Sequence, residues 1–320
     1  MDATQHHTGI HRARHRIMNV LESDPARVIE RRIEQVYRLP PMPELGRRIL
    51  ALQSNPNAGA QQLGQIVELD PSLAAQVIRY ASSSYYGYPG RIVNIQDAIA
   101  RVLGYEMVLN LALGMAAGRS FKIPEAGPLG LGSFWERAIC IAVLTQKLVP
   151  LMPDSLRPAA GEAYLCGLLH DFGVLLLGHL FPPEFQLLNR MAALHPDQPL
   201  SDIERHVLGM GEAREMLALG HARIGAWLMQ TWNMPKSIQI TLLEHHNSGY
   251  SGEHQVLVHL VQLAEALLRQ RFDAREAVVV PETSLGICEI APEHALDVLE
   301  QVNESAEELL HLSALLVAVS

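Results

Sequence analysis

The chain has 320 residues, of which 48% are hydrophobic and 18% charged, and its formal net charge is −9. This composition is that of a globular protein and excludes a disordered one. Nine acids and no Lys or Arg follow Arg275, so the rest of the chain has equal numbers of acids and bases. Neither part has the excess of basic residues that nucleic-acid binding needs. The three cysteines form no Cys-x-x-Cys pair, and no apolar run reaches the roughly 18 residues that a membrane span needs. We therefore expect a cytoplasmic protein with reduced thiols, no membrane segment, and one large domain or two smaller ones.

The N-terminal arm, residues 1–37, is basic and rich in histidine. It contains the run HHTGIHRARHR and lacks the apolar segment of a secretory signal. Asp24-Pro25 is a helix-start signal for an entry helix at the end of this arm. We expect the first residues to be solvated and to contribute little to folding.

Apolar residues then recur at helical spacing almost throughout, and alternating strand patterns are scarce. The helices expected from this spacing are Pro43–Leu52, Ala58–Leu69, Leu73–Ser82, Asn94–Leu103, Glu106–Ala117, Phe134–Val149, Ala160–Leu180, Pro183–Leu194, Glu212–Gln230, Lys236–Glu244, Gln255–Arg271 and Pro292–Val317. In Asp70-Pro71, Asp is placed to cap a helix and Pro takes its first position. Arg91–Val93 and Ala277–Val280 could be isolated strands but not a core sheet. The sequence therefore predicts an all-α fold.

The loop Pro124–Gly132, rich in Gly and Pro, is the best internal boundary. About five short helices precede it, and longer helices that carry most midchain histidines follow it. We expect a smaller N-terminal helical part, residues 38–123, and a helical bundle, residues 124–272. An acidic C-terminal segment, residues 273–320, completes the chain.

The acidic C-terminal segment has an amphipathic pattern. Apolar residues recur at steps of three and four, with an interruption at Ser313; they are Leu299, Val302, Ala306, Leu309 and Leu316. Leaving such a stripe exposed would be unusual. The segment has no Lys or Arg to offset its Glu side chains, which disfavours a parallel coiled coil. We expect a helix docked on the protein's own bundle; a partner's basic groove and a frayed terminus are the alternatives.

Four places after the Pro124–Gly132 loop carry histidines or carboxylates on helices with apolar faces. They are His170-Asp171 in the run CGLLHDFGVLLLGHL, closed by Gly173; His221, followed one turn later by Gly225; His245-His246 at the end of a helix; and Glu265. Imidazole and carboxylate groups are suitable ligands for Zn, Fe, Mn or Ni, and the four places could converge inside one bundle. Alternatively, each is a helix-face residue, and the His pair caps a helix C-terminus.

Taken in this order, the set resembles the HD superfamily of metal-dependent phosphohydrolases. The preceding half of the chain is similar to the opening of the HDOD branch. This resemblance includes Leu39-Pro40, Asp70-Pro71, Ser84-Tyr85-Tyr86-Gly87, and Ala98-Ile99 leading to Leu103-Gly104. It covers roughly Arg38 to Phe272 and implies an all-α regulatory or scaffolding module of bacterial signalling proteins, for which enzymatic activity is generally not established.

The string Gly87-Tyr88-Pro89 does not support the related HD-GYP branch. It lies far upstream of His170, whereas in HD-GYP proteins the string follows the His-His pair. Cyclic-di-GMP hydrolysis is therefore not indicated by it.

Three departures from the active relatives bear on activity. Arg137, in FWERAICIA, holds the place of a histidine, and a guanidinium cannot ligate a metal ion. Val174 stands where HD-GYP enzymes have a Lys for the substrate phosphate. Glu265 stands where the relatives have a final Asp ligand, a change that lengthens the side chain by one methylene.

The resemblance and these departures imply a non-catalytic signalling protein that acts through a partner protein or a small ligand. The alternative is a phosphohydrolase with a reduced, mononuclear site that binds one divalent Fe, Mn, Ni or Zn ion. Its ligands would be His170, Asp171, His221, His245 and His246. A second ion would need the missing histidine. In a metal-free cluster, Arg137 would pair with Asp171.

Overall fold

The computed structural model describes residues 39–317, except residues 54, 56, 197, 207–210 and 273–279. The basic arm, residues 1–37, lies outside the described residues, as does most of the expected strand at residues 277–280. Every regular element within the described ranges is a helix. The all-α prediction is confirmed.

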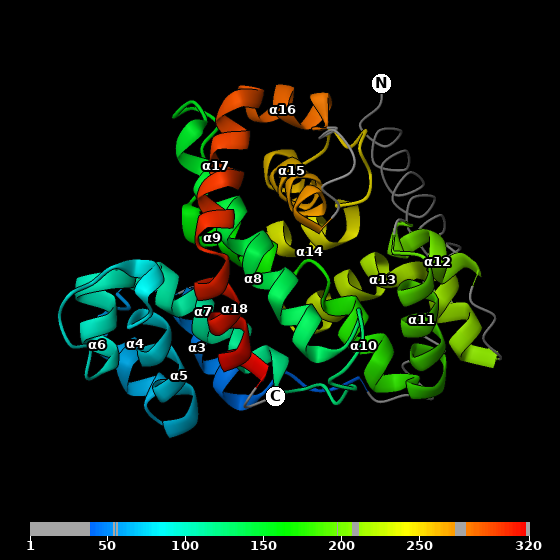
Figure 1. The fold of residues 1–320 in the computed structure, drawn as a ribbon. Coiled ribbons are helices and arrows are strands. Elements are labelled where there is room, and N and C mark those ends of the chain that lie inside the picture. The colour runs from blue at the N-terminus through cyan, green and yellow to red at the C-terminus, as the bar shows by residue number, and fades with distance from the viewer. Residues whose placement is uncertain are drawn as a thin grey trace, which may run out of the picture.

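The N-terminal part forms one end of the molecule, drawn in blue and cyan in Figure 1. Its elements are α3 (Glu44–Gln53), α4 (Ala60–Val67), α5 (Pro71–Ala81), η1 (Ser84–Tyr86), α6 (Ile95–Ala98), the π-helical turn η2 (Ile99–Leu103) and α7 (Tyr105–Gly118). The Asp70 carboxylate caps α5 as predicted, because it accepts hydrogen bonds from the backbone N–H groups of Ser72 and Leu73. Arg91–Val93, a possible strand from the sequence, has no regular secondary structure.

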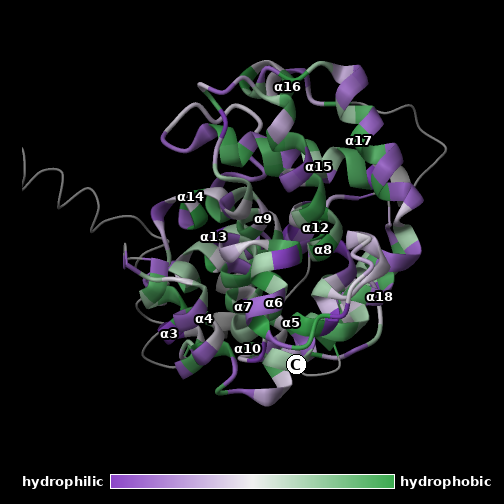
Figure 2. Cartoon of the chain, turned by 90° about the vertical axis from the view of Figure 1, so that its left-hand side faces the viewer, coloured by the Kyte–Doolittle hydropathy of each residue, from purple (hydrophilic) through white to green (hydrophobic). Residues whose placement is uncertain are grey.

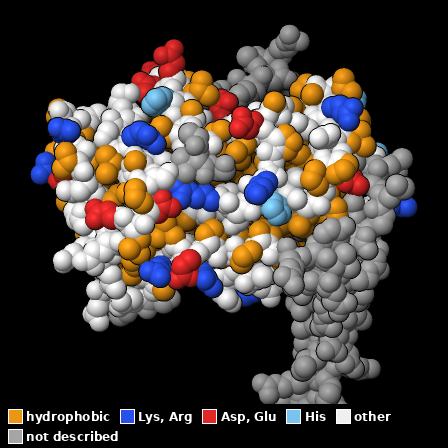
Figure 3. Space-filling model, turned by 90° about the horizontal axis from the view of Figure 1, so that it is seen from below, with side chains coloured by type: hydrophobic (Ala, Val, Ile, Leu, Met, Phe, Trp, Pro, Cys, Tyr) orange, Lys and Arg blue, Asp and Glu red, His pale blue; other side chains and the backbone are white. Residues whose placement is uncertain are grey.

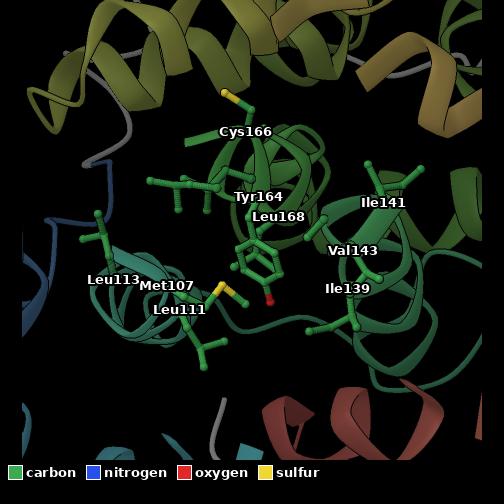
Figure 4. Packing of buried hydrophobic residues seen from close by; sticks show 14 of the residues in the cluster. Met107, Leu111, Leu113, Ile139, Ile141, Val143, Tyr164, Cys166 and Leu168 are labelled. Atoms are coloured by element: carbon green, nitrogen blue, oxygen red, sulfur yellow. The ribbon is translucent and has the colours of Figure 1, made fainter. Parts of the chain in front are cut away.

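The bundle is built on two helices that pack along each other, α8 (Leu131–Leu148) and α9 (Ala160–Leu169). The other elements of the bundle are η3 (Val149–Leu151), α10 (Phe172–Leu180), α11 (Pro182–Leu194), α12 (Leu200–His206), α13 (Gly211–Thr231), α14 (Lys236–Glu244) and α15 (Gln255–Phe272). Helix α7 joins the N-terminal part to this bundle by packing on α9. In Figure 4 the Tyr164 ring of α9 lies between α7 side chains such as Met107 and α8 side chains such as Ile139. Its hydroxyl meets the hydroxyl of Tyr80, from α5, at 2.9 Å.

Two of the expected helices are interrupted in the bundle. The stretch Ala160–Leu180 turns at His170-Asp171, which separates α9 from α10, and α13 has a kink at Gly220, where φ is 79°. By length and composition, Ala160–Leu180 could cross a membrane, which the sequence analysis did not anticipate. However, 89% of its most apolar window is buried inside the protein, so it forms part of the core.

The described part of the acidic segment, which we call the C-terminal strap (residues 280–317), packs on the bundle. It comprises α16 (Glu282–Cys288), α17 (Pro292–Glu304) and α18 (Ala306–Val317). The single helix expected over Pro292–Val317 is divided at Ser305. This turn lets α17 lie against α8 and α15, while α18 lies against α8, α5 and η1. In Figure 1 the strap runs from orange to red, across the bundle towards the N-terminal part.

The inner face of α18 is apolar, and its buried polar groups are paired. Leu309 and Leu316 are buried, as the amphipathic pattern predicts. Ser313 does not break this face, because its hydroxyl donates to the Leu310 carbonyl of the same helix at 2.8 Å. Gln76, a buried residue of α5, donates to the carbonyl of Leu315 near the end of α18, where carbonyls lack intrahelical partners. The strap therefore connects the bundle with the N-terminal part.

The side chains follow the usual division between core and surface. Figure 2 shows hydrophobic residues concentrated where the helices meet and hydrophilic residues on outward faces. On the face seen in Figure 3, acidic and basic side chains are interspersed among apolar and uncharged ones. This face has a mixed charge.

Candidate functional site

The structure brings the predicted site residues together around one carboxylate, and we call this group the Asp171 cluster. Its members are Arg137 on α8, His170 and Asp171 between α9 and α10, His221 on α13, His245 and His246 after α14, and Glu265 on α15. The Asp171 side chain is buried at the start of α10. Residues of α8, α13 and α15 thus form a single site with residues at the ends of α9, α10 and α14.

Two glycines allow His221 to reach Asp171. A Cβ atom on Gly173, in α10, would lie 1.9 Å from the carbonyl oxygen of His221. A Cβ atom on Gly225, one turn after His221, would lie 3.0 Å from the backbone nitrogen of Gly173. The backbones of α10 and α13 are therefore in direct contact, and a side chain at Gly173 would separate them.

The two oxygens of Asp171 face different partners. Oδ2 accepts a hydrogen bond from Nη2 of Arg137 at 2.7 Å and lies 3.3 Å from Nε2 of His170. Oδ1 lies 3.3 Å from Nε2 of His221 and 3.7 Å from Nε2 of His245. Burial opposes ionisation of Asp171, but His170 together with His221 and His245 outweighs it and holds the pKa of Asp171 well below its usual range. Asp171 is therefore a carboxylate shared by all these groups.

Three histidines are oriented through Nδ1. In His170 and in His245, this atom lies 2.7 Å from the backbone carbonyl oxygen three residues earlier. A carbonyl only accepts hydrogen bonds, so we assign the ring hydrogen to Nδ1 in both. Nδ1 of His221 lies 2.9 Å from Oε2 of Glu204. All three rings therefore present Nε2 to Asp171, which is the arrangement that metal-binding histidines use.

Glu204 is the site residue that the sequence analysis missed. It lies on α12, a helix that was not expected, and its side chain is buried. Besides its contact with Nδ1 of His221, the Glu204 carboxylate accepts a hydrogen bond from the backbone N–H of His221, at 3.1 Å to Oε1 and 3.2 Å to Oε2. The surrounding run SDIERH is polar, so nothing in the sequence marks this glutamate as a buried one.

Neighbouring carboxylates reverse the effect of burial on two of the histidines. Burial disfavours protonation of His170, but Asp171 beside it outweighs burial and raises the pKa of His170 to about 10. At His221 burial is likewise outweighed, chiefly by Glu204, and the pKa of His221 is raised to about 10. Without a bound cation, both rings are therefore protonated at neutral pH.

Glu265 places a second carboxylate beside His170. Its Oε1 lies 3.4 Å from Nε2 of His170. Burial opposes ionisation, but His170 together with His245 and His246 outweighs it, so the pKa of Glu265 is lowered to about 2. In the metal-free protein Arg137 and the two imidazolium rings supply three positive charges. The carboxylates of Asp171 and Glu265 offset part of this positive charge.

The histidine side of the cluster also fits one divalent ion. Ligand atoms of His221, His245 and His246 lie within 4.8 Å of one another, and Nε2 of His221 is 2.8 Å from Nε2 of His246. Around an ion bound at about 2.1 Å, neighbouring ligands are about 3.0 to 3.4 Å apart. Nε2 of His245 is buried and makes no hydrogen bond within the described residues. A buried lone pair without a partner is costly, and a cation held by these histidines and Asp171 would satisfy it.

The other side of the cluster does not fit an ion. His170, Asp171 and Glu265 form a second group of potential ligands within 4.8 Å of one another. Here the guanidinium of Arg137 is hydrogen-bonded to Oδ2 of Asp171. A guanidinium has no lone pair to donate and repels a cation. The charge of Arg137 therefore disfavours a second ion on this side of the cluster.

Members of the Asp171 cluster differ in their exposure to solvent. His170, His221 and His245 are buried. The side chain of Arg137 is 35% exposed, and His246 is also exposed. A ligand from solution would thus meet Arg137 and His246 first.

The HDOD domain profile matches residues 39–248, which is well over half of the chain. The chain belongs to the HDOD domain family. The resemblance stated from the sequence is confirmed. The match to the HDOD profile includes the His245-His246 pair and ends before Glu265 and the C-terminal strap.

The chain is also similar to solved structures and to one curated relative. A protein from Marinobacter aquaeolei VT8, provisionally assigned to signal transduction, has a TM-score of 0.75 and 36% identity over 89% of this chain and 61% of its own. A Shewanella amazonensis SB2B protein, provisionally assigned as a phosphohydrolase, has a TM-score of 0.69 and 19% identity. The match covers 92% of this chain and 99% of the Shewanella chain, and at this identity it shows the fold alone. An uncharacterized protein of Treponema pallidum (strain Nichols) is 26% identical over 275 residues, 85% of this chain. The HDOD chain spans 50% of the length of that curated relative.

Val174 shows how this HDOD domain departs from a phosphate-binding site. The side chain is fully buried and belongs to a hydrophobic cluster with Leu177, Ile224 and Trp227. A lysine at this position would have to bury its charge among these side chains, which is costly. The position therefore serves α10 packing and supplies no cation for a substrate.

Proposed function

We propose that this HDOD protein is a non-catalytic regulatory module of a cytoplasmic signalling pathway, which acts by binding a partner protein or a small ligand. The observation that carries the proposal is the hydrogen-bonded ion pair between Arg137 and Oδ2 of Asp171, at 2.7 Å. Phosphodiester hydrolysis commonly uses two ions to stabilise both the attacking and the leaving oxygen. Here a side chain of the protein takes the place of one of them.

Two further observations support a binding role. Without an ion, the carboxylates of Asp171 and Glu265 are already paired with Arg137 and His170. Val174 is part of the core, so the cation that HD-GYP enzymes place after His-Asp-x-Gly has no equivalent here. The provisional assignment of the Marinobacter protein to signal transduction is in keeping with this function.

The proposal is tested by assaying phosphohydrolase activity with added Mn²⁺, Fe²⁺, Ni²⁺ or Zn²⁺. Substrates are cyclic dinucleotides, pppGpp, dNTPs and the generic diester bis(p-nitrophenyl) phosphate. We expect the wild-type protein to show no more turnover than the His170→Ala variant. Turnover that the His170→Ala substitution abolishes would overturn the proposal.

One observation favours a second candidate, a phosphohydrolase with a mononuclear site. Nε2 of His245 is buried without a hydrogen-bond partner in the described structure. An ion held by His221, His245, His246 and Asp171 would supply a Lewis acid for a phosphoryl oxygen and a bound water of lowered pKa. Glu204 would hold the His221 ring in place for such an ion.

Elemental analysis of untagged protein, purified without added metal, distinguishes the two candidates. Stoichiometric Fe, Mn, Ni or Zn that is lost in the His245→Ala variant, together with turnover, would establish the second candidate. Absence of metal would exclude it. Metal without turnover would leave the regulatory function, with the ion as part of the module.

A further inference from the structure

A second buried polar network lies where the C-terminal strap meets α15, and we call it the His259 network. His259 and Gln262 lie one turn apart on α15, and Ser284 lies on α16. All three side chains are buried. Oγ of Ser284 lies 3.0 Å from Nδ1 of His259 and donates to Oε1 of Gln262 at 3.1 Å. The hydroxyl of Ser284 thus links the strap to the His259 and Gln262 side chains of α15.

The other ends of the two α15 side chains hold the segment between α14 and α15. Nε2 of His259 donates to the carbonyl of Tyr250 at 2.8 Å. Nε2 of Gln262 donates to the carbonyls of Asn247, at 2.9 Å, and Glu244, at 3.3 Å. These carbonyls span residues 244–250, the segment that contains the His pair of the Asp171 cluster. The network therefore fixes the backbone on both sides of that pair.

The placement of Ser284 makes this network depend on the strap. Ser284 lies outside residues 39–248, the part of the chain that the HDOD profile matches. Without its hydroxyl, Nδ1 of His259 and Oε1 of Gln262 would lose the one group that both contact, in a buried place. Leaving buried polar atoms unpaired is costly, so the two side chains would give up their present positions.

We infer that Ser284, His259 and Gln262 are positioning residues through which the C-terminal strap controls the placement of His245 and His246. With α16 docked, the network holds the carbonyls of residues 244–250, and the His pair stays against Asp171. When α16 moves away, the hold on this segment is released. The inference deepens the proposed function, since it identifies the strap as the input to the Asp171 cluster.

The experiment compares hydrogen–deuterium exchange in the Ser284→Ala and Ser313→Ala variants of the full chain. Ser313 is a matched control, because it is also a buried serine of the strap but bonds only to its own helix within the described structure. We expect Ser284→Ala to speed amide exchange about tenfold in residues 244–254, as the loss of paired buried polar atoms predicts. Exchange in α8 should not change. Ser313→Ala should alter exchange in residues 244–254 by less than about twofold.

A second variant keeps the test decisive if Ser284→Ala folds poorly. Gln262→Met retains the length of the side chain and removes the amide that binds residues 244–250, so it should produce the same local increase. The inference is overturned if exchange in residues 244–254 stays within twofold in both variants, or if exchange in α8 rises as much.

Titration with Co²⁺ separates this inference from the proposed function. If the wild-type protein binds Co²⁺, Ser284→Ala should weaken binding about tenfold and Ser313→Ala should not, as expected when supporting groups of a metal site are lost. Equal affinities of all three proteins would overturn the inference. If the wild-type protein binds no Co²⁺, the mononuclear phosphohydrolase fails, whereas the exchange comparison still decides whether the strap positions the His pair.

Discussion

The Asp171 cluster and the His259 network are two buried polar assemblies on either side of residues 244–250. In the His259 network, the three side chains contact one another and backbone carbonyls, and no carboxylate or guanidinium takes part. The Asp171 cluster is rich in charge, and Nε2 of His245 makes no hydrogen bond within the described residues. A hydrogen-bonded network such as that of His259 supports the fold. Charged groups around a buried nitrogen without a partner, such as Nε2 of His245, are typical of a binding site.

The largest expected effect comes from removing the shared anion of the Asp171 cluster. Asp171→Ala leaves the Arg137 guanidinium and two protonated histidines without their common partner. We expect the free energy of unfolding, measured in urea, to fall by about 3 to 5 kcal/mol. Asp154→Ala is the control, because the side chain of Asp154 is 92% exposed where it pairs with Arg157. Its effect should be below about 1 kcal/mol, and similar losses in both variants would contradict the central role of Asp171.

A slightly smaller effect is expected where the backbones of α10 and α13 touch. Gly173→Ala would place a Cβ atom 1.9 Å from the carbonyl oxygen of His221, so the two helices must separate. We expect a loss of about 3 kcal/mol, measured by thermal unfolding. Gly286→Ala, on α16, is the control because a Cβ atom there meets nothing within 4 Å. That variant should be unchanged or slightly more stable; an equally stable Gly173→Ala protein would show that the helices are not in contact.

The amphipathic pattern predicted most helices well but not their breaks. Lys236–Glu244 was expected and is observed with the same bounds. The break at His170-Asp171 was missed because apolar residues continue on both sides of it. The turn at Ser305 was missed for the same reason. Both breaks follow from tertiary packing: the first orients Asp171 at the start of α10, and the second lets α18 reach the N-terminal part.

The Asp171 cluster was more predictable than the groups that support it. Buried histidines and acids on apolar helices stand out in a sequence, and their order carried the family resemblance. Glu204 and Ser284 lie on α12 and α16, helices of seven residues, which are too short for a clear periodic pattern. Their hydrogen bonds join residues distant in sequence, so only the three-dimensional structure shows them.

The third prediction concerns Glu204, which supports the Asp171 cluster without belonging to the predicted set. Glu204→Gln weakens the acceptor for Nδ1 and the backbone N–H of His221, so the ring is held less firmly. We expect Co²⁺ affinity to fall about ten- to a hundredfold. Glu68→Gln is the control, because that glutamate is exposed in the N-terminal part, and the Co²⁺ affinity of this variant should be unchanged. A Glu204→Gln protein with unchanged affinity would show that the ion is not held through His221.

The smallest expected effect tests whether buried polar groups outside the Asp171 cluster are only structural. Gln76 is buried and donates to the Leu315 carbonyl, which ties α5 to the end of α18. Gln76→Ala removes one uncharged hydrogen bond and should lower the free energy of unfolding by about 1 kcal/mol. Gln186→Ala, at an exposed position of α11, should have almost no effect. Because Gln76 binds the strap at α18, whereas Ser284 lies on α16, Co²⁺ affinity should stay within about twofold of the wild-type value. A larger loss of affinity would mean that the strap acts on the His pair through α18 as well, and the contrast between the two buried assemblies would no longer be local.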